Sequence, residues 1–102
     1  MKISPNETLI TGRWIEHKGQ LVGDDTCKRI NELIRNYLHE IGRDPSGWDA
    51  LYRDPQDARL WELIYPESEL HGGGPPQLRC LTYGEAEEKY GLAITKSLRP
   101  PP

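Results

Sequence analysis

The sequence predicts an α+β fold, in which a small antiparallel sheet is backed by one long amphipathic helix and followed by a short C-terminal helix. Three observations lead to this prediction. Apolar residues recur at intervals of three and four between residues 24 and 41, which indicates a helix. Short runs rich in β-branched and aromatic residues lie on both sides of it and indicate strands. Thr82-Tyr83-Gly84-Glu85 matches a capping box and predicts a second helix.

The long helix is predicted from Asp24 to Ile41. Asp24 or Asp25 caps its N-terminus, where a carboxylate also meets the positive end of the helix dipole. Gly42 supplies the left-handed residue that ends it. The apolar stripe consists of Cys27, Ile30, Leu33, Ile34, Tyr37, Leu38 and Ile41.

The strands are predicted from composition and turn residues. Along Arg59–Tyr65, apolar side chains fall on both faces, which indicates a central strand with both faces at least partly covered. The residues alternate so that Glu62 points away from the face of Trp61 and Leu63. The expected order is a hairpin (Thr8–Glu16 with Leu21-Val22), a second hairpin (Trp48–Asp54 with Arg59–Tyr65), a last strand (Leu78–Thr82) and a short helix (Glu85–Tyr90).

Length and composition predict a single domain over residues 1–91, with a proline-rich tail at 92–102 that is extended or disordered. The chain has 102 residues and two cysteines, which is no disulfide framework. No run is long enough to span a membrane, and no apolar stretch near Met1 resembles an export signal. We therefore expect a cytoplasmic protein without a membrane partner.

The charge is unevenly distributed. Residues 1–53 carry eight acidic and eight basic side chains, whereas residues 54–90 carry eight acidic and three basic ones, a net charge of −5. The chain as a whole has a net charge of −3, which argues against nucleic-acid binding. The acidic segment is either an ordinary solubilising surface or a face for a basic partner.

A glycine-rich string, His71-Gly72-Gly73-Gly74, follows the second predicted hairpin and lies within the acidic segment. No G-x-S-x-G nucleophile accompanies it, which excludes the hydrolases that use a similar string as an oxyanion hole. Two prolines follow the glycines, so the string is no phosphate loop either. We expect a stiff, shaped loop with at least one glycine at positive φ.

A metal-binding or hydrolytic reading of the same region remains the alternative. Glu67, Glu69 and His71 alternate, so an extended segment would project them to one side as a ligand set, and Cys80 would be the nucleophile. The set lacks a fourth ligand. We expect no enzyme activity, no resident metal and no cofactor.

Several strings taken together resemble one family. They include Gly12-Arg13-Trp14, Asp25-x-Cys27-x-Arg29-Ile30, Gly47-Trp48-x-x-Leu51-Tyr52-Arg53-Asp54-Pro55, Arg59-x-Trp61-Glu62-Leu63-x-Tyr65-Pro66, Gly72-Gly73-Gly74-Pro75-Pro76-x-Leu78-x-Cys80-Leu81 and Glu85-Ala86-x-Glu88-Lys89-Tyr90-Gly91. In order and spacing they resemble the bacterial immunity proteins of polymorphic toxin systems, and most closely immunity protein 27. The resemblance implies an antidote that binds and blocks the C-terminal domain of a cognate secreted toxin.

The residues expected to touch the toxin combine aromatic anchors with acidic side chains, a composition found at binding hot spots and steered interfaces. Toxins that cut nucleic acids have basic clefts, so we expect a nuclease toxin whose active site the protein occludes. The sequence leaves the oligomeric state open. The candidate residues are Trp48, Tyr52, Asp54, Asp57, Glu62, Glu67, Glu69, His71, Gly72, Gly73 and Gly74.

Overall fold

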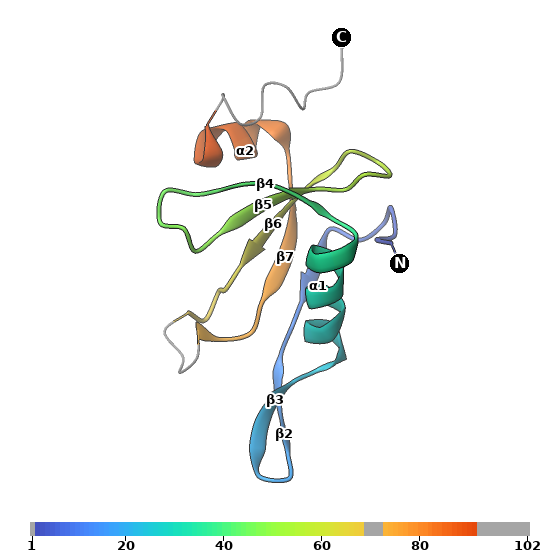
Figure 1. The fold of residues 1–102 in the computed structure, drawn as a ribbon, viewed down its shortest axis with the longest axis vertical. Helices are drawn as coiled ribbons and strands as arrows, with labels where there is room; N and C mark the ends of the chain where they lie inside the picture. Colours follow the sequence, from blue (N-terminus) through green and yellow to red (C-terminus); the bar gives the residue numbers. More distant parts are fainter. Residues whose placement is uncertain (1, 69–72, 92–102) are drawn as a thin grey trace.

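The structure, a computed structural model, describes residues 2–68 and 73–91 and confirms the α+β prediction (Figure 1). The described part contains a five-stranded antiparallel sheet in the order β1-β7-β6-β5-β4 and a separate two-stranded sheet of β2 and β3. The elements are β1 (Leu9–Thr11), β2 (Trp14–His17), β3 (Gln20–Gly23), α1 (Asp25–Asn36), β4 (His39–Arg43), β5 (Ala50–Arg53), β6 (Leu60–Ile64), β7 (Gln77–Leu81) and α2 (Tyr83–Tyr90). The predicted tail at 92–102 lies outside the described residues.

The central strand β6 separates two apolar layers, as its sequence predicts. Trp61 and Leu63 belong to the larger layer, which α1 covers with Ile30 and Leu33. Leu60 points to the opposite face and belongs to the smaller layer, which α2 covers. The smaller layer is formed by Leu51, Leu60, Leu81, Ala86 and Tyr90.

The long helix is shorter than predicted. It is capped by Asp24, whose carboxylate accepts a hydrogen bond from the Cys27 backbone at 2.9 Å, but it ends at Asn36 instead of Ile41. The backbone N–H groups of Tyr37 and Leu38 both reach the carbonyl of Leu33, at 3.1 and 2.7 Å, and close the helix there.

The last residues of the predicted helix form the edge strand β4 instead. The pairing of β4 with β5 shifts register between Glu40 and Gly42, so Gly42 lies in a strand and is no helix stop. Leu38 packs in the layer under α1, whereas Ile41 packs in the layer under α2. The spacing of these two apolar residues is typical of a helix, but in the structure they pack on opposite faces of the sheet.

The predicted first strand is divided at Gly12, so that β1 joins the main sheet and β2 leaves it. The Gly12 N–H donates to the carbonyl of Pro76 at 2.9 Å, and a Cβ there would lie 2.6 Å from the sulfur of Cys27. Only glycine fits at this crossing. The β2–β3 hairpin then extends beyond the sheet (Figure 1) and turns at Lys18 and Gly19, both at positive φ.

The predicted capping box is confirmed at the start of α2. The Thr82 hydroxyl accepts from the backbone of Glu85, and the Glu85 carboxylate accepts from the backbone of Thr82 at 2.9 Å. Gly91 ends the helix with a φ of 100°. This cap fixes where α2 leaves β7 and turns back over the sheet.

Candidate partner-binding site

A groove of about 390 Å³ runs between the C-terminal part of α1, the β4–β5 hairpin and the segment that follows β6. It brings together three of the predicted partner-binding residues: Trp48 and Tyr52, which are close in sequence, and Gly73, which is remote from them. Its lining residues are Ile34, Arg43, Gly47, Trp48, Tyr52, Leu63, Tyr65 and Gly73. We call it the aromatic groove.

Trp48 is 65% exposed on the loop that joins β4 to β5. The Asp44 carboxylate organises this loop, because it accepts hydrogen bonds from the Ser46 hydroxyl at 2.8 Å and from the backbones of Gly47 and Asp49 at 3.1 and 3.2 Å. Partial desolvation opposes these bonds, yet they lower the pKa of Asp44. The loop therefore presents a large aromatic side chain from a backbone that is fixed by local hydrogen bonds.

Tyr52 forms part of the floor of the groove and is buried. Its hydroxyl donates to Glu40 at 3.4 Å. Burial, and to a smaller degree the nearby Glu40 and Tyr65, raises the pKa of Tyr52. Glu40 also accepts from Arg43 at 3.1 Å, so the cation that lines the groove already has a carboxylate partner.

The glycine loop has the backbone that the sequence predicts. Gly73 and Gly74 have φ values of 88° and 77°, in the left-handed region. A Cβ on Gly74 would clash with the backbone carbonyl of Glu67, whereas one on Gly73 would meet nothing within 4 Å. Gly74 therefore holds the two arms of the loop together, and Gly73 borders open space beside the groove. The predicted contacts Glu69, His71 and Gly72 lie outside the described residues.

Glu62, which is among the predicted partner contacts, does not face the solvent. It is fully buried beneath α2, where Arg79 Nε, Lys89 Nζ and the Tyr90 hydroxyl reach its carboxylate at 2.7, 2.6 and 2.7 Å. Burial alone would raise its pKa, but the hydrogen bonds from Lys89 and Tyr90 outweigh burial and hold the pKa of Glu62 below its usual range. The alternation along β6 is as predicted, but α2 covers the face to which Glu62 points.

Two further acidic candidates also have partners within the chain. Asp54 is buried, and it accepts from the Tyr37 hydroxyl at 2.6 Å and from the Gln56 backbone at 2.8 Å. Burial and this bond raise the pKa of Tyr37 to about 12. Asp57 pairs with Arg59 at 2.7 Å. These two carboxylates stabilise the β5–β6 turn.

The acidic segment therefore forms no single face. Ile64 of β6 pairs with Gln77, and Leu60 pairs with Leu81, so the two ends of the β6–β7 pair are well separated. Glu67 follows the first end, whereas α2 follows the second. The exposed carboxylates of the segment are thus divided between opposite ends of the sheet.

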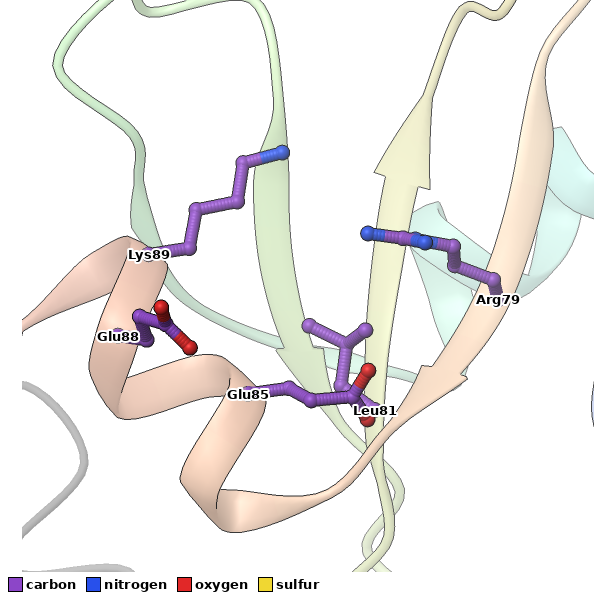
Figure 2. A pocket seen from close by; sticks show the side chains of 5 residues that line it. All are labelled: Arg79, Leu81, Glu85, Glu88 and Lys89. Carbon is purple, nitrogen blue, oxygen red and sulfur yellow. The ribbon is translucent and has the colours of Figure 1, made fainter.

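A smaller cavity of about 220 Å³ lies beside α2 (Figure 2). Lys89 extends from α2 and Arg79 from β7, above the side chain of Leu81, with Glu85 and Glu88 on the helix side. Lys89 also pairs with Asp49 at 2.7 Å, which links α2 to the loop that carries Trp48. The cations of this cavity are thus already paired with carboxylates of the chain.

The metal-binding or hydrolytic alternative gains nothing from the residues that are described. Cys80 pairs with Trp61, three residues along β7 from the end near Glu67. Burial raises the pKa of the Cys80 thiol, which disfavours the reactive thiolate. No three His, Cys, Asp or Glu side chains gather as a metal site within residues 2–68 and 73–91.

Five residues of the groove are not among the predicted contacts: Ile34, Arg43, Gly47, Leu63 and Tyr65. Ile34 and Leu63 appear in the sequence only as core positions, and Tyr65 only as a strand residue. Arg43 lies in β4, a strand that the sequence does not predict. The sequence does indicate that Leu63 and Tyr65 share one face of a strand. It does not indicate which other segments pack beside that face to form the groove.

Neither helix in the described chain is long and apolar enough to cross a membrane. The comparison with curated proteins and the comparison with solved structures each gave no match. The family model of immunity protein 27 matches residues 16–82, which run from the end of β2 through β7 and include the whole aromatic groove. The chain therefore belongs to the immunity protein 27 family, as its sequence motifs predict.

Proposed function

We propose that this protein neutralises a cognate toxin by binding the toxin domain through the aromatic groove. Family membership supports an immunity function. The observation that supports this choice of surface is Trp48, which is 65% exposed beside a groove with two further aromatic side chains. Tryptophan, tyrosine and arginine are the residue types enriched at binding hot spots, and all three line this groove.

The groove suits protein recognition because its parts are already ordered. The loop of Trp48 is held by Asp44, and on the other side of the groove Gly74 lies in close contact with the backbone of Glu67. An ordered surface loses less conformational entropy on binding than a flexible one. A toxin side chain that enters the groove would also bury the exposed indole, which removes apolar surface from water.

We further propose that the toxin is a nuclease, that binding occludes its active site and that the encounter occurs in the cytoplasm. The acidic face that first led to this prediction is divided in the structure, so the proposal rests on the carboxylates near the groove. Asp44 contacts the backbone of the groove residue Gly47, and Glu67 lies against Gly74, next to the groove residue Gly73. Carboxylates there would attract a cleft built to bind phosphates. Inhibition then needs no catalytic group in the immunity protein.

Growth rescue tests the proposal. Cells that express the toxin domain encoded beside this gene should survive with the wild-type protein and die with Trp48→Ala. Leu9→Ala is the matched control, because Leu9 is also more than half exposed but lies on β1, outside the groove. Both variants should have the far-UV spectrum and melting temperature of the wild type. Rescue by Trp48→Ala as complete as that by Leu9→Ala would exclude the groove, and failure of the wild type would exclude the toxin.

A further inference from the structure

We propose that the aromatic groove accepts a lysine or arginine side chain of the toxin, with the cation over the indole face of Trp48. This inference rests on the proposed function and deepens it, because it names the chemistry of the occupant. Three observations support it: aromatic rings line the groove, the chain's own Arg43 has a carboxylate partner, and carboxylates with no ion-pair partner among the described residues lie near the edge of the groove, which we call its rim.

Three aromatic rings supply the surface that would attract a cation. Trp48, Tyr52 and Tyr65 line one groove from three different segments: the β4–β5 loop, β5 and the residue after β6. The face of an aromatic ring carries partial negative charge, and tryptophan attracts cations most strongly. Trp48 is also the most exposed of the three. A side chain that enters from outside therefore meets its indole first.

The chain's own cations do not occupy this indole. Arg43 lines the groove, but its guanidinium donates to Glu40 at 3.1 Å and to the Gly47 carbonyl at 3.4 Å. The cation–π contacts found among the described residues are Arg59 over Trp61 and Lys89 over Tyr90, and both lie elsewhere. Because Glu40 balances Arg43, the groove carries little net positive charge that would repel an incoming cation.

The rim adds negative charge. Asp44 follows the groove residue Arg43 and accepts a hydrogen bond from the backbone of Gly47, and Glu67 lies against Gly74, next to the groove residue Gly73. Neither has a cation within ion-pair distance among the residues that the structure describes. Two other described carboxylates near the groove have cationic partners, since Glu40 pairs with Arg43 and Asp49 with Lys89. The unmatched charge of the rim is therefore negative and complements a basic side chain.

An uncharged apolar side chain is the competing occupant, because Ile34 and Leu63 also line the groove. The two occupants differ in how they respond to the electron density of the indole. Fluorine atoms on the ring weaken the negative potential of its face but leave its size and apolar character nearly unchanged. Fluorination therefore weakens the binding of a cation and not the binding of an apolar side chain.

The test places mono-, di- and trifluorotryptophan at position 48 by stop-codon suppression and measures the dissociation constant of the cognate toxin domain. The same series at Trp14, on the β2–β3 hairpin outside the groove, is the control. We expect the dissociation constant to rise with each fluorine at position 48, by about threefold to thirtyfold over the series, which corresponds to cation–π energies of about 0.7–2 kcal/mol. The Trp14 series should show no trend.

The outcomes separate this inference from the proposed function. If Trp48→Ala weakens binding but the fluorinated series is flat, the occupant is apolar and this inference is wrong, although the groove still binds the toxin. If Trp48→Ala leaves the affinity unchanged, the groove is not the interface, and both proposals fail. A flat series with an affinity that is independent of salt would further exclude the charge of the rim from binding.

Discussion

Replacing Glu62 by leucine should strongly destabilise the protein, although Glu62 is surrounded by apolar strands. The substitution keeps the side chain's approximate size but removes the acceptor of three donors, Arg79, Lys89 and Tyr90. Removing one partner of a buried charge pair costs about 3–5 kcal/mol. We expect the lower end, about 3 kcal/mol, because Arg79 is half exposed and Lys89 keeps Asp49.

Urea unfolding at pH 7 measures this effect, and the melting temperature should fall by roughly 10–25 °C. Glu88→Gln is the control, since Glu88 is exposed on the same helix and should change the unfolding free energy by less than about 0.5 kcal/mol. A Glu62→Leu variant as stable as Glu88→Gln would show that the buried ion pairs do not hold α2 on the sheet.

Three further predictions concern other parts of the molecule. Arg29 holds the pKa of Glu7 at about 2, so the ion pair stabilises the fold above pH 4.5 and this stabilisation is lost as the pH falls towards 2. Glu7→Gln should remove this pH-dependent part of the unfolding free energy, about 1 kcal/mol after allowance for solvent, as measured by urea titrations at pH 6 and pH 2.5. Gly74→Ala should lower the melting temperature more than Gly73→Ala in thermal scans, because both strain φ but only the first meets a backbone carbonyl; equal losses would contradict this. Glu67→Lys should slow toxin association in stopped-flow measurements at low salt by at least threefold, with a difference that disappears at 0.5 M salt; a rate that does not depend on salt would refute a basic partner.

The fold was largely predictable because its main signals are local. The Asp24 cap, the apolar stripe through Leu33 and the Thr82 capping box depend on residues a few positions apart, and each is confirmed. Strand β4 was not predictable in this way. Ile41 in this strand and Leu38 just before it continue the helical spacing, and the strand conformation depends on pairing with β5.

The candidate site was predictable only in part, for a related reason. Trp48 was identified because it follows a loop of proline, serine and glycine, which is a local signal. The groove beside it also contains Tyr52, Tyr65 and Ile34. These residues come together only in the tertiary structure, so the spacing of residues in the sequence does not predict the groove. Glu62 shows the limit most clearly: alternation gave its face correctly, but only the position of α2 shows that this face is buried.

The most direct test of the account compares the affinity of the cognate toxin domain for the wild type, Trp48→Ala and Leu9→Ala, by calorimetric titration at 0.15 M salt. Hot-spot truncations cost about 2 kcal/mol or more, so Trp48→Ala should weaken binding at least about thirtyfold. Leu9→Ala should change the dissociation constant by less than about twofold, since an exposed residue outside the interface contributes little. Equal dissociation constants for the three proteins would contradict the account, because the toxin would then bind elsewhere than at the aromatic groove.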